Sequence, residues 1–154
     1  CQKKGLIGAI GASGYPLEPL LNLAKHPSVS IILSYAKYCL INTELKVVMD
    51  QFSQSKVDVI NASPLAMGLL SQKGPAHWHP AKEAHSQLLN LAKTKDIEKA
   101  SLNFAFDQNH FASTLVGFSN ITELDFALNC YKNGSKDDYV DTFNALKPLR
   151  PLNW

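Results

Sequence analysis

The sequence has no long hydrophobic run, no block of like charge and no paired cysteines. No apolar run approaches the ~20 residues that cross a bilayer, and the basic and apolar start is too short for a signal peptide. The net charge is +2 and the lysines are scattered, which argues against a nucleic-acid-binding face. The three cysteines, Cys1, Cys39 and Cys130, lack metal or redox spacing. We therefore expect reduced thiols in a cytoplasmic protein that binds neither membranes nor nucleic acids.

The length and composition fit one globular piece. The chain has 154 residues, of which 45% are hydrophobic, and no low-complexity linker divides it. We treat residues 1–154 as a single unit. Because the chain begins with Cys1 rather than methionine and a strand-like run follows within a few residues, we expect it to be part of a longer protein.

The most informative segment is the run from Val57 to Leu70. Its β-branched start is typical of a strand buried on both faces, and Pro64 requires that strand to end at Ala62 or Ser63. Ser63 then presents a hydroxyl at the carboxyl end of a strand, where α/β proteins bind ligands. A plain exit from strand to loop is the alternative interpretation of the same residues.

Strand-like and helical patterns alternate along the chain, which predicts an α/β fold with a parallel sheet. An open doubly wound sheet and half of a (β/α)8 barrel both fit, since a full barrel needs ~250 residues. Asn120 caps one helix, with Glu123 three positions on, and Lys93-Thr94-Lys95 forms a solvated junction between two others. The predicted strands are Leu6–Gly11, Val29–Leu33, Val57–Ala62 and Thr114–Val116, and the predicted helices are Pro16–Lys25, Thr43–Gln54, Ala81–Lys93, Asp96–Asn109, Asn120–Lys132 and Lys136–Leu146.

Two motifs resemble a dinucleotide-binding turn and a metal site, but neither has the residues that such a site needs. The glycines at positions 5, 8, 11 and 14 are each separated by two residues, whereas a dinucleotide-binding turn needs G-x-G-x-x-G. We expect Gly8 and Gly11 to allow a crowded strand to pack and Gly14 to take the turn. His77 and His79 lack a nearby Cys, Asp or Glu cluster, so we predict no metal site and a surface loop that packs Trp78 over the edge of the fold.

An ordered set of short segments gives the chain a family resemblance. The sequence resembles the C-terminal half of the aldo-keto reductase superfamily, and within it the branch of L-galactose dehydrogenases and related aldose 1-dehydrogenases. Each segment is weak alone, but together they span nearly the whole chain in order. The matching segments are Ile10–Leu17, Ile32–Tyr35 with Tyr38 and Asn42, Ile60–Leu70, Gly74-Pro75 with Trp78-His79-Pro80, and Leu115–Ser119.

The resemblance implies a (β/α)8 barrel that binds NAD(P) across the carboxyl ends of its strands, with this chain supplying strands five to eight. Ser13 and Gly14 match the segment that holds the nicotinamide carboxamide, although Gly14 replaces a common asparagine. Ser63, Leu65 and Met67 match the loop that wraps the pyrophosphate. The segment that grips the adenosine end is matched by Ser119, Asn120 and Glu123.

Several positions depart from the family pattern. Ala62 stands where many relatives carry an aromatic ring that stacks on the nicotinamide, and Phe126-Ala127 replaces a pair that commonly reads adenine. Glu123 stands where relatives that prefer NADP often carry arginine. A carboxylate there would repel a 2′-phosphate and accept a hydrogen bond from a 2′-hydroxyl, so we expect NAD rather than NADP.

The family's catalytic tyrosine, lysine, aspartate and histidine belong to the first half of the barrel, so we assign no catalytic residue to this chain. Three hypotheses remain open. The chain is the cofactor-binding half of an aldose dehydrogenase that oxidises the anomeric carbon of L-galactose, L-fucose or D-arabinose to a lactone. Alternatively it is a non-catalytic binding or regulatory subunit. The third hypothesis is a half-barrel fragment with no activity of its own, which exposes an apolar sheet edge and pairs with another half.

Overall fold

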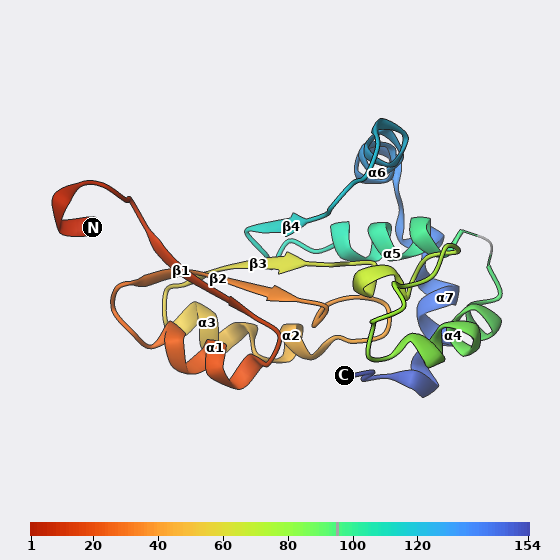
Figure 1. The fold of residues 1–154 in the computed structure, drawn as a ribbon, viewed down its shortest axis with the longest axis horizontal. Helices are drawn as coiled ribbons and strands as arrows, with labels where there is room; N and C mark the ends of the chain where they lie inside the picture. The colour runs from red at the N-terminus through yellow and green to blue at the C-terminus, as the bar shows by residue number, and fades with distance from the viewer. Residues whose placement is uncertain (95) are drawn as a thin grey trace.

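Four parallel strands form one sheet in the computed structural model, which describes residues 1–94 and 96–154 (Figure 1). The strand order follows the chain, β1-β2-β3-β4, and every neighbouring pair is parallel. This confirms the predicted α/β class. Because the strands are parallel, all four carboxyl ends lie at the same edge of the sheet. The strands are β1 (Ile10–Gly14), β2 (Val29–Tyr35), β3 (Asp58–Ala62) and β4 (Ser113–Leu115).

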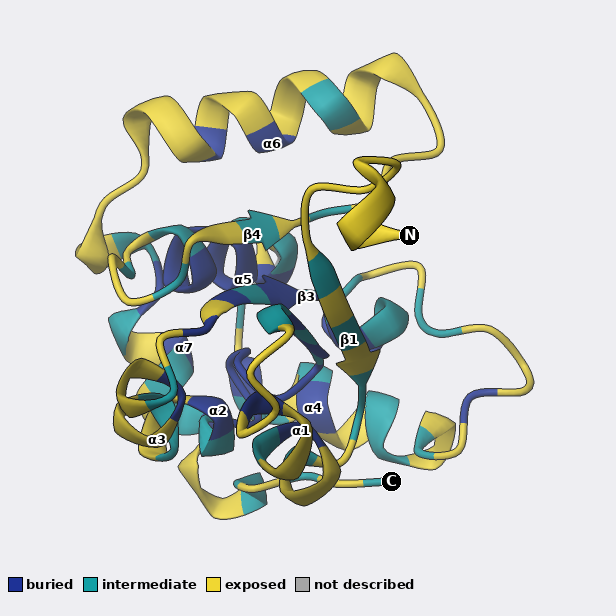
Figure 2. Cartoon of the chain, turned by 90° about the vertical axis from the view of Figure 1, so that its left-hand side faces the viewer, coloured by how far each residue is buried: buried dark blue, intermediate teal, exposed yellow. Residues whose placement is uncertain are grey.

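Helices connect these strands, as a parallel sheet requires. Helices α1, α2 and α3 lie along one side of the sheet (Figure 1), whereas α6 lies apart from it with most of its surface exposed (Figure 2). The helices are α1 (Leu17–Ala24), α2 (Glu44–Val47), α3 (Met49–Gln54), α4 (His85–Ala92), α5 (Ile97–Phe106), α6 (Ile121–Asn133) and α7 (Val140–Ala145). None of them is long and apolar enough to span a membrane in the part of the chain that the structure describes.

The first strand was predicted too early, at Leu6–Gly11. It begins at Ile10, which pairs with Val29, the first residue of β2, and Leu6 is 72% exposed. Gly8 has no neighbour close enough to need a glycine, so its predicted packing role is wrong. Gly11 does have that role, since a Cβ there would lie 2.8 Å from the Ile31 carbonyl oxygen. Gly14 is the last strand residue, and the chain turns after it.

Several predicted helices are shorter or broken, and the one expected over Asp96–Asn109 ends at Phe106. The helix expected over Thr43–Gln54 is two short helices, because Val48 has non-helical backbone angles. The helix expected over Ala81–Lys93 begins at His85, after a 3-10 turn, and ends where Lys93 takes a left-handed conformation. The last helix is likewise a 3-10 turn followed by α7. At the predicted junction between α4 and α5, Lys95 lies outside the described residues.

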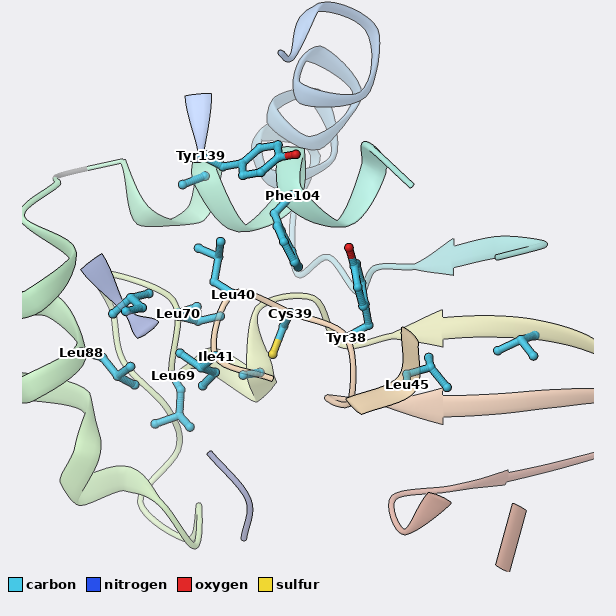
Figure 3. Close-up of a cluster of buried hydrophobic side chains, with 14 of the residues drawn as sticks. Tyr38, Cys39, Leu40, Ile41, Leu45, Leu69, Leu70, Leu88, Phe104 and Tyr139 are labelled. Carbon is cyan, nitrogen blue, oxygen red and sulfur yellow. The ribbon is translucent and has the colours of Figure 1, made fainter. Parts of the chain in front are cut away.

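The segments that follow β2 and β3 are buried rather than exposed. Tyr38 to Asn42 are at most 2% exposed, and Leu69 and Leu70 are fully buried. Their side chains meet those of Leu88 from α4 and Phe104 from α5 (Figure 3). This core lies beyond the carboxyl ends of the strands and holds both segments against the helices. The loops at that edge are therefore fixed by packing.

The two sides of the sheet differ in exposure. In β2, Ile32 and Ser34 are completely buried toward the helices, whereas Leu33 and Tyr35 on the other side are partly exposed. Alternation places Ser13 on the same side as Leu33, with which it is paired. The sheet thus has one covered face and one face open to a further layer.

Candidate functional site

The candidate residues all lie at the carboxyl edge of the sheet. Ser13 and Gly14 are the last two residues of β1. Ser63, Leu65 and Met67 belong to the loop that begins directly after β3, as Pro64 predicts. The remaining three follow β4 at the start of α6: they are Ser119, Asn120 and Glu123.

The loop after β3 has an unusual backbone. Ser63, Ala66 and Met67 have φ values of 58°, 48° and 53°, a left-handed conformation that non-glycine residues seldom adopt. Gly68 follows with φ 97°, and a Cβ on it would lie 3.0 Å from both the Gly74 carbonyl oxygen and the Pro75 Cα. Only glycine fits where the two arms of the loop approach so closely. Strain of this kind gathers at ligand-binding sites, where the surrounding structure maintains it.

A cavity of about 510 Å³ lies between this loop and the start of α6. Leu65 and Gly68 line it from the loop after β3, and Phe118 and Glu123 line it from the segment after β4. Ser71 and Lys73 add a hydroxyl and an ammonium group, while most of the other lining atoms are apolar. The structure therefore brings together two predicted segments that are about fifty residues apart in sequence. Phe126 and Ala127, the pair that departs from the family pattern, line the same cavity.

Glu123 is held by its neighbours at the start of α6. Its carboxylate accepts hydrogen bonds from the Ser119 backbone N–H at 2.7 Å and from the Ser119 hydroxyl at 2.8 Å. The Asn120 side-chain oxygen accepts from the Glu123 backbone N–H at 2.9 Å, which confirms the predicted N-cap. The two bonds from Ser119, the one from its N–H first, lower the pKa of Glu123, and so do the Asn120 side-chain amide, which donates to the carboxylate at 3.1 Å, and the nearby Lys73 ammonium. The carboxylate is thus ionised at neutral pH and fixed at the cavity wall.

Ser13 and Gly14 do not reach this cavity, because β2 and β3 separate β1 from β4. Among the described residues, neither the Ser13 nor the Ser63 hydroxyl has a hydrogen-bonding partner. In the same part of the chain, no three His, Cys, Asp or Glu side chains are arranged to hold a metal ion. What this edge offers is hydroxyl groups, the Lys73 ammonium, the carboxylates of Glu98 and Glu123 and apolar surface, spread over a long strip.

A model of the aldo/keto reductase family matches residues 1–147. The chain belongs to the aldo-keto reductase family. It is 32% identical to L-galactose dehydrogenase of Arabidopsis thaliana over an alignment of 167 positions, which covers 99% of this chain and 52% of that protein. It is 26% identical to D-arabinose 1-dehydrogenase of Saccharomyces cerevisiae over 148 positions, covering 85% of this chain and 44% of that protein. The chain thus spans about half the length of these curated relatives.

A solved structure shows the same fold. The holo form of an aldo-keto reductase from Bacillus halodurans matches 99% of this chain with a TM-score of 0.70, at 15% sequence identity, and the match covers 54% of that protein. At this identity the likeness concerns the fold alone. It includes nearly every element described above.

The residues at the edge of the sheet suit the NAD(P) that aldo-keto reductases usually bind. A dinucleotide is long, with a pyrophosphate between two partly apolar ends, so it needs hydroxyl or amide donors, a cation and apolar surface in a row. Ser13 and Ser63 supply unpartnered hydroxyls, Lys73 supplies the cation, and the cavity beside Glu123 supplies apolar surface. The donor set therefore fits the cofactor.

Sequence reasoning missed one group of residues at this edge of the aldo-keto reductase chain. His79 is 1% exposed and lies beneath the loop, whereas Trp78, expected to pack over the fold, is 63% exposed. Tyr15, Lys37 and Trp154 come together from distant parts of the chain. No periodicity marks these residues, since each contact joins separate loops. The only sequence signal for these residues is that an aromatic or charged side chain stands close to a strand end.

Proposed function

We propose that residues 1–154 are the C-terminal half of a (β/α)8 barrel, supplying strands five to eight of an NAD(P)-dependent aldose dehydrogenase. The observation that carries the proposal is the row of candidate binding groups along one edge of a four-stranded parallel sheet whose second face is open. The two curated relatives act on sugars according to their names, and this chain matches about half of each. Ligands bind at this edge in α/β barrels.

Within this proposal, the cofactor lies across the strand ends. Ser13 and Gly14 hold the nicotinamide end through the free hydroxyl and the open backbone at the end of β1. Ser63, Leu65 and Met67 enclose the pyrophosphate with the strained loop, while Ser119 and Asn120 border the adenosine end. The bound NAD(P) supplies a hydride acceptor for the anomeric carbon of an aldose, which is oxidised to a lactone. The groups that take the hydroxyl proton belong to the other half of the barrel.

Glu123 favours NAD over NADP in this arrangement. Its carboxylate is ionised, exposed and fixed by Ser119, so a 2′-phosphate would approach a negative charge that cannot move away. A ribose 2′-hydroxyl could instead donate a hydrogen bond to it. The nearby Lys73 lessens this effect, and we therefore expect a preference rather than exclusion.

Calorimetric titration of the full-length protein with NADH and NADPH tests the proposal. We expect NADH to bind at least about tenfold more tightly, and Glu123→Gln to narrow that ratio by strengthening NADPH binding. Asp125→Asn, which removes an exposed carboxylate from the same helix, serves as the matched control and should leave the ratio unchanged. Absence of binding by either nucleotide to the folded protein would overturn the cofactor assignment.

A further inference from the structure

His79 is held in one orientation by its own segment. It is 1% exposed, and its ring Nδ1 accepts a hydrogen bond from the Ala81 backbone N–H at 3.1 Å. The His79 backbone is fixed as well, since its N–H donates to the Ala76 carbonyl at 2.9 Å and its carbonyl accepts from the Lys82 N–H at 3.1 Å. An Nδ1 that accepts carries no proton, so the neutral ring is protonated at Nε2. The observed orientation therefore belongs to the uncharged ring.

The His79 ring lies against the loop that follows β3, residues 63–68, which we call the cofactor loop. Burial lowers the pKa of His79 and the Ala66 backbone opposes it, which only an acceptor can do, so the Ala66 carbonyl lies near the ring. Ala66 is fully buried and has a φ of 48°, between the left-handed residues Ser63 and Met67. A backbone of this kind persists only where its surroundings maintain it. His79 is part of those surroundings.

The other neighbours of the His79 ring are aromatic. Its centroid lies 4.8 Å from that of Trp154 and 6.3 Å from that of Trp78. Over the part of the chain that the structure describes, no ion pair involves His79 and no charged side chain shifts its pKa. A positive charge on this ring would therefore be buried without a counter-charge. The titratable side chains of its own segment are all exposed: His77, Lys82 and Glu83.

Protonation of His79 would disrupt this arrangement. It adds a hydrogen to Nδ1, which would then face the Ala81 N–H at 3.1 Å, so that two donors oppose each other. It also places an uncompensated charge in a buried position. The ring must then turn or move toward solvent, and Ala66 loses the side chain that packs against it. The cofactor loop, which carries Ser63, Leu65 and Met67, would no longer be held in its strained conformation.

We propose that His79 is a positioning residue for the cofactor loop, whose uncharged ring keeps the loop in its binding conformation and whose protonation weakens binding of the dinucleotide. The proposal rests on the NAD(P) assignment argued above. Cofactor affinity should be complete at a pH above the range in which His79 titrates and should be lost as the pH falls through that range. Because linkage is reciprocal, bound cofactor should in turn lower the pKa of His79.

The other titratable groups near the cofactor loop do not share this property. The His85 Nε2 lies 2.8 Å from the Ser71 carbonyl oxygen, which can only accept, so Nε2 donates. That donor is present in both the neutral and the charged ring, and the bond survives protonation. Lys73, Glu98 and Glu123 line the cavity beside the loop. They are unchanged in a variant at position 79, so a comparison at that position isolates the effect of His79.

The first test is calorimetric titration of the full-length protein with ADP-ribose, which carries the pyrophosphate and adenosine of the cofactor without its nicotinamide. Between about pH 7.5 and about pH 5.5, we expect Kd to rise about three- to tenfold, since one linked proton changes affinity by at most about tenfold per pH unit. Near-UV circular dichroism at each pH verifies that the protein is folded.

Matched variants assign the effect to His79. His79→Asn keeps an acceptor for the Ala81 N–H but does not titrate in this range, so its Kd should change less than about twofold. His26→Asn alters an exposed histidine whose Nδ1 accepts from Ser28 in the same way, and it should follow the wild-type profile.

A second measurement needs no variant of the cofactor loop. Proton NMR follows the titration of the histidine rings in the full-length wild-type protein, with and without saturating ADP-ribose. The ligand should move the His79 titration to lower pH and leave that of His26 unchanged. A merely structural His79 would titrate identically in both samples.

The outcomes separate this proposal from the function on which it rests. Absence of ADP-ribose binding to the folded protein at about pH 7.5, where His79 is uncharged, would overturn the cofactor assignment and this role of His79 with it. Binding whose pH profile is the same in the wild type and His79→Asn, or a His79 titration that ADP-ribose leaves unchanged, would overturn the role of His79 and leave the cofactor assignment standing.

Discussion

His79 and His26 share a local motif but differ in burial. Each precedes a proline, and each Nδ1 accepts a hydrogen bond from the backbone N–H two residues on, at 3.1 Å from Ala81 and 3.2 Å from Ser28. His26 is exposed, whereas His79 is 1% exposed and its Nε2 has no hydrogen-bonding partner among the described residues. Burial lowers the pKa of His79 and outweighs the Ala66 backbone, which acts in the opposite direction. The same three-residue pattern therefore lies exposed in one place and buried in the other.

This difference predicts a dependence of stability on pH. Because the folded-state pKa of His79 lies below its unfolded value, the unfolded chain binds the proton more readily. Its contribution to stability is complete above the unfolded pKa, near about 6.5, and is lost as the pH falls through that value. We expect the urea midpoint to decrease between about pH 7.5 and about pH 5.

Two matched variants isolate the effect. Asparagine keeps an acceptor for the backbone N–H but does not titrate in this range. His79→Asn should flatten the pH dependence, while His26→Asn should follow the wild-type curve. Parallel curves for the wild type and His79→Asn would show that other groups cause the loss.

At the scale of elements, the joint between α5 and α6 depends on a glycine. A Cβ on Gly134, just after α6, would lie 2.2 Å from the Asn103 side-chain oxygen and 2.4 Å from the Cys130 carbonyl oxygen. Asn103 is 3% exposed, and neither of its side-chain polar atoms has a partner in the described part of the chain. The sequence predicted that this helix ends at Lys132, one residue before its observed end at Asn133, but gave no sign of this contact with α5.

Gly134→Ala should therefore lower the free energy of unfolding by about 1–3 kcal/mol, the usual cost of overpacking. Denaturant unfolding measures the change. Asn103→Ala in the same chain should recover part of that loss, because it removes one of the two clashes and leaves the Cys130 carbonyl. Gly8→Ala, at a position with no close neighbour, is the control and should change stability little. If the loss of unfolding free energy in the Gly134→Ala/Asn103→Ala double variant equals the sum of the losses in the two single variants, the contact between Gly134 and Asn103 is contradicted.

At the scale of the whole molecule, the sheet has two edge strands and one open face. β1 and β4 are the edges, and Leu115 on β4 is 55% exposed. Ile121 and Tyr131 on α6 are each 69% exposed. This exposure agrees with the proposal that another half completes the barrel.

We expect residues 1–154, expressed alone, to self-associate and to bind an apolar fluorescent dye, because the edge strands and the open face lack their partners. Sedimentation measures the association. Leu115→Lys, which places a charge on the β4 edge, should reduce it, whereas Val47→Lys, at a still more exposed position on α2, should not. A chain that stays monomeric, unfolds cooperatively and binds no dye would show that the half-barrel needs no partner.

The sequence by itself determined the features that depend on neighbouring residues. Pro64 cannot continue a ladder, so β3 ends at Ala62, and Asn120 caps α6 because its side chain reaches the N–H of Glu123 three residues on. Alternating strand and helix patterns likewise predicted the parallel α/β sheet. The end of β3, the cap of α6 and the alternation of strands and helices each depend on residues that are close together in the sequence.

Only the tertiary structure decided the features that depend on distant partners. The first strand starts at Ile10 because β2 offers nothing to pair with earlier. Leu65 and Glu123 share a cavity because β3 and β4 are adjacent. Trp154 reaches Tyr15 across 139 positions, and Lys37 is buried because that segment covers it. Such contacts form when packing brings distant segments together, and no pattern of neighbouring residues predicts them.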